Sequence, residues 1–401
     1  MRTLLTASQN TYSRINVSPY SDSLKKVETM NKSKSKRLFL FTSIFAGIFL
    51  QGCSEEQTTP SQQTSLQAIE PCSEDSWLTA WCGYKNAEDL VATPDGRFLL
   101  ATGFGGLPDS YINEMMIIDL STMDKEPVKV LLESNSWGDP SCTRTSTDFS
   151  THGMDLIERA DGAKMVAVTN HLPKETIEFF EPIQTGASWN LVWRGCVESP
   201  VLEEGTRQPM FNDVALTADG GFYATEMYNA KTPFDELLDA GAAGKDSGQV
   251  WFWSSEEGFS ALQGTSGGFP NGIVITPDES TLFVNYWFSG KTIKFDLKSA
   301  QTLAVHTGGR ADNLTLSNGS LLASKHDMSL TDFFEKCPPE TTNCFLPFSI
   351  HKFDSDLNEL KTWSFESSTF GLATVATPVG ENVWLGTAHG DRIASFKISP
   401  Q

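Results

Sequence analysis

Two histidines that flank a predicted turn are the first residues in the sequence suited to acid–base chemistry. His152 and His171 are equidistant from the centre of Asp161-Gly162, a dipeptide that favours the tight turns of β-hairpins. In a two-residue hairpin without a bulge, they lie directly opposite each other on one face of adjacent strands, with Cβ atoms about 4.5–5.5 Å apart. Imidazoles this close can exchange a proton or shift each other's pKa near neutrality. The spacing predicts a catalytic dyad; a chance cross-strand pair with a structural role is the alternative.

Carboxylate and carboxamide residues recur six to nine positions before similar turns elsewhere in the chain: Glu88, Asp89, Asn212, Asp213, Asn271, Asp312 and Asn313. Where the strands that carry them converge, these oxygen donors cannot be buried together without a cation. Ca²⁺ is the ion that prefers such ligands, so the pattern predicts a calcium site. The alternative is that Asn and Asp only make local Asx turns where strands begin. His326 follows the fifth of these turns and is placed to reach the same point.

An internal repeat supplies the elements that position these residues. A polar residue, an apolar strand, a tight turn and a second apolar strand follow one another six times, with turns at residues 95, 161, 219, 278, 318 and 381. Six hairpin units predict an all-β fold, a six-bladed β-propeller, in which the first strand of each blade lines the central channel. An irregular β-sandwich explains the hairpins but not their six copies. The best helix candidate covers residues 233–243.

Composition and missing motifs exclude several classes of function. Lys and Arg total 30 against 50 Asp and Glu, a net charge of −20 that would repel phosphate backbones, so nucleic-acid binding is excluded. The sequence contains no His-Glu-x-x-His and no P-loop, and a serine nucleophile is not predicted. His306, His351 and His389 show no comparable arrangement, and we expect them to be solvated or at the edge of the core.

The first 52 residues have the character of a leader. A basic run precedes the 13-residue apolar stretch 38–50, which is too short to span a bilayer on its own but fits a signal-peptide core. Met30 is the expected true start. The segment ends in Leu50-Gln51-Gly52-Cys53, which resembles the bacterial lipobox and predicts lipidation of Cys53; an ordinary secretory signal with a chance cysteine is the alternative. Residues 53–70 are expected to form a flexible tether and 71–401 a single propeller domain.

Six further cysteines are expected to form disulfides, because an even number in an exported chain is typical of them. Six cysteines permit 15 pairings. The simplest pairs Cys337 with Cys344 across a short loop, and then Cys72 with Cys82 and Cys142 with Cys196. No Cys-x-x-Cys pair is present, so zinc or thioredoxin-type chemistry is not expected.

Six short motifs resemble, in order, those of the paraoxonase/arylesterase family of calcium-dependent propellers, within the wider gluconolactonase-like group. The resemblance covers residues 86–396, and its motifs are Ala87-Glu88-Asp89-Leu90, Thr151-His152-Gly153-Met154, Val168-Thr169-Asn170-His171-Leu172-Pro173, Phe211-Asn212-Asp213-Val214, Phe269-Pro270-Asn271-Gly272 and Ala311-Asp312-Asn313-Leu314. Each motif alone is weak, whereas six in sequence are specific.

The resemblance implies roles for individual residues. The ligands of a catalytic calcium would be Glu88, Asn212, Asn271, Asp312 and Asn313. The ligands of a buried structural calcium would be Asp89, Asp213 and the carbonyl of Met154. His152 and His171 would be the base dyad, and the substrate pocket would be lined by Phe269, His326 and Thr374. The family's disulfide between the N-terminal segment and the last strand has no counterpart, an acidic pocket residue is replaced around Met227, and the loop 328–347 looks like an insertion over the mouth.

These observations predict an exported, membrane-anchored bacterial lipoprotein, facing the periplasm or the cell surface, that hydrolyses lactones or aryl esters. Its partners would be a small-molecule lactone or ester and the membrane that holds its lipid. Two alternatives belong to other classes. One is a gluconolactonase-like sugar-lactone hydrolase with a metal-bound Asp as base, and the other is a non-catalytic ligand-binding propeller.

Overall fold

The computed structural model describes residues 70–107, 111–186 and 188–398. The leader, Met30, Cys53 and the tether up to residue 69 lie outside these residues. Among the described residues, no helix has the length and apolar character needed to cross a membrane. The predictions for the N-terminal segment therefore remain predictions.

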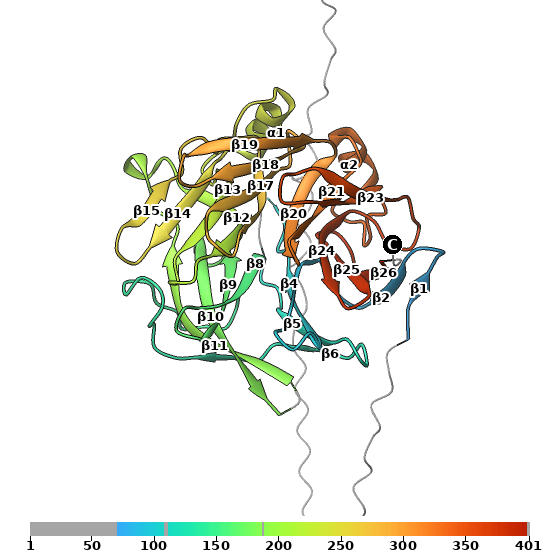
Figure 1. Cartoon of the computed structure of the whole chain (residues 1–401), viewed down its shortest axis with the longest axis horizontal. Helices are drawn as coiled ribbons and strands as arrows, with labels where there is room; N and C mark the ends of the chain where they lie inside the picture. Colours follow the sequence, from blue (N-terminus) through green and yellow to red (C-terminus); the bar gives the residue numbers. More distant parts are fainter. Residues whose placement is uncertain (1–69, 108–110, 187, 399–401) are drawn as a thin grey trace, which may run out of the picture. The chain divides into compact units, whose positions relative to one another are not determined.

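The described chain forms six largely antiparallel sheets arranged as the blades of a propeller (Figure 1), as the repeat predicts. The strands of blade 1 are β3 (Ala87–Ala92), β4 (Phe98–Gly103), β5 (Met116–Asp119) and β6 (Lys125–Pro127). Those of blade 2 are β8 (Thr151–Glu158), β9 (Lys164–Asn170), β10 (Thr176–Thr185) and β11 (Ser188–Glu198), with β7 (Val130–Leu132) parallel to β11. Those of blade 3 are β12 (Pro209–Leu216), β13 (Phe222–Asn229), β14 (Val250–Ser254) and β15 (Gly258–Ala261).

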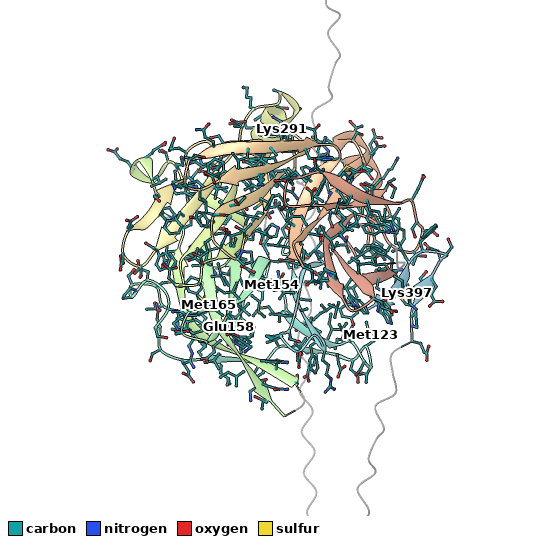
Figure 2. The ribbon with its side chains drawn as sticks, viewed as in Figure 1. Met123, Met154, Glu158, Met165, Lys291 and Lys397 are labelled. Carbon is teal, nitrogen blue, oxygen red and sulfur yellow. A yellow bond between two sulfur atoms is a disulfide. The ribbon has the colours of Figure 1, made fainter. Side chains whose placement is uncertain are left out.

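Blades 4 and 5 repeat the same four-stranded order. The strands of blade 4 are β16 (Pro270–Ile275), β17 (Thr281–Tyr286), β18 (Lys291–Asp296) and β19 (Gln301–Thr307). Those of blade 5 are β20 (Arg310–Ser317), β21 (Ser320–His326), β22 (Phe348–Phe353) and β23 (Glu359–Phe365). The first strands β8, β20 and β24 (Ala373–Val379) lie around the middle in Figure 1, and Met154 of β8 is labelled there in Figure 2.

Blade 6 closes the ring by combining strands from both ends of the described chain. It contains β24, β25 (Asn382–Thr387) and β26 (Arg392–Lys397), followed by β2 (Thr79–Cys82) and β1 (Ser73–Glu74). The closing pair is antiparallel, from Thr79 opposite Ser395 to Cys82 opposite Arg392. Leu78 and Ala80 are buried in the same apolar cluster as Phe396. A ladder and its core therefore join the two ends, where the resembled family uses a disulfide.

The predicted turns connect the first and second strands of all six blades. Blades 1, 3 and 4 share one local device, in which a threonine hydroxyl donates to the aspartate two residues later: Thr93 to Asp95, Thr217 to Asp219, and Thr276 to Asp278. A positive φ is needed in these turns, and Gly96 of blade 1 and Gly220 of blade 3 supply it at 66° and 92°. Local turn chemistry thus fixes the hairpins that the repeat predicts.

In the part of the chain that the structure describes, helical structure lies in connections between strands. The predicted helix is present as α1 (Phe234–Ala242), between β13 and β14. A second helix, α2 (Leu330–Lys336), begins with a capping box between Ser329 and Asp332 and lies within the predicted insertion 328–347. A short 3₁₀ turn, η1 (Glu203–Gly205), precedes β12. The insertion contacts blade 6, because the Asp391 amide donates to Asn343 and His389 Nε2 lies 2.5 Å from the carbonyl of Thr341.

The three disulfides pair as the simplest arrangement predicts. They join Cys72 to Cys82, Cys142 to Cys196, and Cys337 to Cys344, over sequence separations of 10, 54 and 7 residues. Three disulfides are typical of chains exported to an oxidising compartment.

We predict that these crosslinks stabilise the fold unequally. A disulfide lowers the entropy of the unfolded chain more when its loop is longer, which amounts to about 4 kcal/mol for Cys142–Cys196 and about 2 kcal/mol for Cys337–Cys344. Replacing both cysteines of each pair by alanine and measuring urea unfolding should give the larger loss for Cys142–Cys196. An equal or reversed order would contradict the loop-length argument.

Candidate metal and catalytic site

All six first strands have a register shift at the same level, and the predicted site residues lie at these shifts. The shifts fall between Ala87 and Asp89, Thr151 and Met154, Phe211 and Val214, Pro270 and Ile273, Ala311 and Leu314, and Ala373 and Val375. A β-bulge of this kind adds a residue to one strand and redirects its side chain. The redirected or adjacent residues are Glu88, Asp89, His152, Asn212, Asp213, Asn271, Asp312, Asn313 and Thr374.

Side chains of one blade hold the bulged strand of the next by donating to its backbone carbonyl. The donor–acceptor pairs are Thr102–His152, Thr225–Asn271, Asn285–Asp312 and Thr374–Glu88, and the three threonine hydroxyls lie 2.6 Å from their acceptors. Each acceptor belongs to a predicted site residue. Thr374, predicted as a pocket residue from the resemblance, therefore links blade 6 to the Glu88 bulge of blade 1.

Two glycines allow neighbouring bulges to approach closely. A Cβ on Gly153 would lie 2.5 Å from an Asp213 carboxylate oxygen, and a Cβ on Gly272 would lie 2.5 Å from the Cα of Asn313. Real Cβ atoms do not approach other atoms so closely. Any larger residue at either position would push apart the side chains that converge between blades 2 and 3, or 4 and 5.

Four of the predicted calcium ligands contain a buried oxygen with no hydrogen-bond partner among the residues that the structure describes. They are Glu88 Oε2, Asn212 Oδ1, Asn271 Oδ1 and Asn313 Oδ1. A buried polar atom without a partner is unfavourable, and four at one level from four blades are not explained by local turns. The donors are all oxygen, which suits a hard cation such as Ca²⁺. The residues present therefore fit the predicted ion.

The carboxyl groups near these oxygens have strongly altered acidity. Burial raises the pKa of Glu88 well above its usual value, and the carboxylates of Asp89 and Asp312 raise it further. Burial and Asp89 likewise raise the pKa of Asp312. Buried carboxyl groups that repel one another favour a proton or a cation.

The predicted second set, Asp89, Asp213 and Met154, lies one step further along the channel. Asp89 accepts the backbone N–H of Met154 at 2.8 Å, and Asp213 accepts that of Ile273 at 2.9 Å, so each carboxylate bridges to the next blade. Asp155, which the sequence analysis did not single out, bridges in the same way to Leu216 at 2.8 Å. The three aspartates line a channel cavity of about 580 Å³.

Burial raises the pKa of these aspartates as well. The pKa of Asp89 rises to about 7 and that of Asp155 to about 6. The pKa of Asp213 rises well above its usual value, first through burial and then through repulsion from Asp89. This part of the channel therefore also carries uncompensated acidic groups.

The two predicted histidines form a direct hydrogen bond, although their predicted register is wrong. His152 Nδ1 lies 2.9 Å from His171 Nε2. The strands pair Met154 with Val168 and Thr151 with Asn170, so His152 lies in a bulge and His171 just beyond the end of β9. The turn is longer than two residues, and the bulge rather than direct opposition brings the imidazoles together.

Glu175 extends the histidine pair, and the sequence analysis missed it. Its Oε2 accepts from Nδ1 of His171 at 2.8 Å, while its Oε1 accepts the backbone N–H of Phe211 at 2.8 Å. With Nδ1–H of His171 given to Glu175, Nε2 of His171 accepts from Nδ1–H of His152. Nε2 of His152 is then an acceptor, and the Asn212 amide donates to it over a long 3.3 Å. Burial, and secondarily His171, lower the pKa of His152 well below its usual value, so its imidazole is neutral at pH 7.

His326 lies at the same centre but its contacts give it a different role. Trp287 Nε1–H donates to His326 Nδ1 at 3.0 Å, which leaves the proton on Nε2. That nitrogen lies 3.0 Å from the carbonyl of Ala373 and 3.3 Å from Asp312 Oδ2. Burial lowers the pKa of His326 to about 3. It is therefore a neutral donor beside Asp312 and has no free nitrogen to act as a base.

An aromatic wall adjoins the site, on the side of Phe269. The Phe269 ring contacts Tyr228, Trp287 and Phe288, with centroids 6.0, 5.8 and 5.0 Å away. Met227, where the resembled family has an acidic residue, is fully buried, and its sulfur accepts from the Asn212 amide at 3.3 Å. The wall is therefore apolar next to the polar centre.

Comparisons with known proteins report resemblance without assigning a family. No protein-family model matches the sequence, and no curated protein matches it. Among solved structures, a gluconolactonase from Xanthomonas campestris is 14% identical with a TM-score of 0.47, over 80% of this chain and 89% of that chain. A luciferin-regenerating enzyme is 12% identical with a TM-score of 0.49, over 79% and 93%. The Cps50 (Swd1) β-propeller domain of Myceliophteria thermophila is 11% identical with a TM-score of 0.45, over 80% and 100%.

We predict a pH-dependent effect of replacing Asp89. A carboxyl group whose pKa is higher in the folded chain stabilises the fold at low pH, and this contribution is lost as pH rises through the folded-state pKa. For Asp89 the window runs from 3.8 to about 7. With chelator present, the melting temperature of Asp89→Asn relative to the parent should therefore rise as pH increases across this window.

Calcium should reverse this trend, because an ion held by Asp89 would favour the ionised carboxylate and stabilise the parent. Thermal unfolding at several pH values, in EDTA and in calcium, measures both effects. A difference in melting temperature that is independent of pH in EDTA would show that Asp89 does not have a raised pKa.

Proposed function

We propose that this protein is an exported, calcium-dependent hydrolase of lactones or aryl esters. One observation chiefly supports the proposal: the hydrogen-bonded series Glu175–His171–His152 ends beside Asn212, which has one of four unpartnered buried oxygens at this centre. A neutral base and a set of oxygen ligands at one point are what metal-assisted ester hydrolysis requires. The ordered motifs that resemble the paraoxonase/arylesterase family support the same class.

The chain's own residues account for the proton transfer. Glu175 accepts from His171 and fixes its tautomer, and His171 in turn accepts from Nδ1–H of His152. Nε2 of His152, whose contact from the Asn212 amide is long at 3.3 Å, would exchange that contact for the attacking water and take its proton as the water oxygen bonds to the ester carbonyl carbon. The neutral imidazole of His326 donates towards Asp312 and keeps that carboxyl in place. The aromatic wall around Phe269 excludes water from the leaving part of the substrate.

Two groups of residues would hold calcium. Glu88, Asn212, Asn271, Asp312 and Asn313 would bind a catalytic ion, and Asp89, Asp213 and the Met154 carbonyl a structural one. Bound at the first position, calcium supplies positive charge that polarises the ester carbonyl and stabilises the developing oxyanion.

We predict that His152→Gln separates base catalysis from metal binding. Losing a general base lowers turnover by about 10²–10⁴-fold. The unpartnered oxygens that would bind calcium belong to other residues and stay in place. Hydrolysis of a panel of lactones and aryl esters should fall by this factor, with little change in calcium affinity or melting temperature. The acid limb of the pH–rate profile should lie below the ordinary histidine pKa of 6.5 and disappear in the variant.

Asn271→Ala is the matched comparison, because it removes an unpartnered oxygen and should weaken calcium affinity and turnover together. Full activity of His152→Gln with an unchanged acid limb would place the base elsewhere, with Asp312 the next candidate, as in a sugar-lactone hydrolase. No turnover of any lactone or ester by the calcium-loaded protein would favour a non-catalytic binding propeller.

The proposal includes a lipid anchor at Cys53, on the basis of the lipobox-like Leu50-Gln51-Gly52-Cys53. We predict that Cys53→Ser moves the protein from the membrane to the soluble fraction of bacterial cells, because a thioether-linked lipid can form only on cysteine. Metabolic labelling with a fatty-acid analogue should be lost in the same variant. Unchanged membrane association and labelling would refute the anchor.

A further inference from the structure

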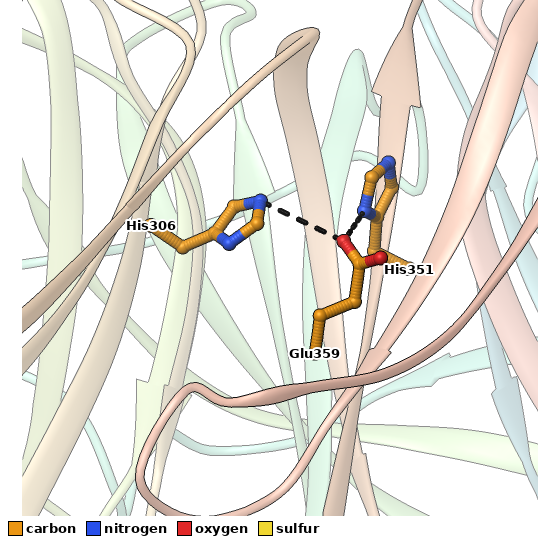
Figure 3. Close-up of side chains that lie close together, drawn as sticks. All are labelled: His306, His351 and Glu359. Atoms are coloured by element: carbon orange, nitrogen blue, oxygen red, sulfur yellow. Dashed lines mark hydrogen bonds and ion pairs between the residues drawn. The ribbon is translucent and has the colours of Figure 1, made fainter.

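Two histidines and a glutamate meet between blades 4 and 5, on strands away from the central channel. His306 lies on β19, His351 on β22 and Glu359 at the start of β23. Figure 3 shows both imidazoles turned towards one carboxylate oxygen. Glu359 Oε2 lies 2.8 Å from His351 Nδ1 and 3.9 Å from His306 Nε2, and all three ligand atoms lie within 4.8 Å of one another.

These separations suit a small transition-metal ion. Zinc binds imidazole nitrogen and carboxylate oxygen at about 2.0–2.2 Å, which puts neighbouring ligand atoms in a tetrahedral site about 3.3 Å apart. The two nitrogen–oxygen distances lie on both sides of this value and every pair lies within 4.8 Å, so shifts of at most about 1.5 Å in partly exposed side chains would complete three corners. The fourth corner would be left for water.

The surroundings of His351 resemble those of a metal-bound histidine. Ser349 Oγ lies 2.9 Å from His351 Nε2, and its hydroxyl oxygen is placed to accept the ring proton on Nε2 when a cation binds Nδ1. Without a cation, Nδ1–H donates to Glu359 at 2.8 Å; a bound cation would replace that proton and be held by both the Nδ1 lone pair and the carboxylate oxygen. The His306 ring packs against Phe353, with centroids 4.7 Å apart, which fixes its orientation.

We propose that His306, His351 and Glu359 form a divalent transition-metal site, with zinc as its reference ion, that links blades 4 and 5. The nitrogen-containing donor set distinguishes it from the all-oxygen centre on the axis. The site does not depend on the proposed hydrolase activity.

Lys325 is the charged residue that most affects this site. It is fully buried on β21, its Nζ has no hydrogen-bond partner among the described residues, and burial lowers its pKa to about 8. Its charge acts on His306 and His351, while Asp327 and Glu359 act on Lys325 with the opposite sign. An ammonium group so placed weakens the binding of a cation, which makes Lys325 a test of where the ion lies.

The experiment measures zinc binding to the full chain in saturating calcium, by equilibrium dialysis with metal analysis. Cys53→Ser is the background for all proteins, because a free thiol also binds zinc. We expect one zinc per chain, and an affinity at least tenfold weaker in His306→Gln and in Glu359→Gln. Zinc should also raise the melting temperature of the parent but not of these variants, because only the folded chain brings blades 4 and 5 together.

His389→Gln is the matched histidine control, and His152→Gln tests binding at the central dyad; both should bind zinc as the parent does. Lys325→Met should bind zinc several-fold more tightly, the opposite sign from the ligand variants. Ester or lactone hydrolysis by calcium-loaded His306→Gln should equal that of the parent, so failure of the hydrolase proposal leaves this test intact. Absence of micromolar zinc binding, or equal binding by His306→Gln and the parent, would show only a His351–Glu359 hydrogen bond and overturn the proposal.

Discussion

Glu88, Asp89, Asp213 and Asp312 bring four carboxyl groups from three blades into the buried centre of the ring. Among the described residues, the ion-pairing partner found for them is His326 beside Asp312, and that imidazole is neutral. Burial and mutual repulsion both favour protonation or a bound cation. The pairing of β2 with β26 closes the ring and holds the blades together around these groups. The acidic centre therefore sets the chemistry that the rest of the fold must accommodate.

The β-bulges of the first strands allow the regular propeller to hold this acidic centre. An unbroken strand alternates its side chains between two faces, so it could not direct neighbours such as Asp312 and Asn313 to the same centre. A shifted register in each first strand redirects one residue at the level of the mouth. The carbonyl groups released from regular pairing are then taken by Thr102, Thr225, Asn285 and Thr374 of preceding blades. The same distortion thus presents the ligands and couples adjacent blades.

Local chemistry made the propeller and the residues of its centre predictable from sequence. Turn residues such as Asp95-Gly96 act within a few positions, and their six-fold recurrence identifies the blades. The register at His152 was not predictable in this way, because a bulge changes pairing by one residue and leaves no mark in the apolar alternation. Glu175 was missed for a related reason: its role depends on a turn that returns its carboxylate to His171.

The pairing of His306 with His351 and Glu359 shows a further limit. These residues belong to adjacent blades, and their contact depends on how outer strands of two sheets face each other. Inner strands converge on one axis, so residues at equivalent positions of the repeat meet there by symmetry. Outer strands diverge, and equivalent positions give no such guide.

The axial centre and the His306–His351–Glu359 cluster also differ in donor type. An all-oxygen set favours a hard ion and an imidazole-containing set a softer one. Calcium at the axis and a transition metal between blades would therefore be selected independently, even though both act across the same kind of blade-to-blade boundary.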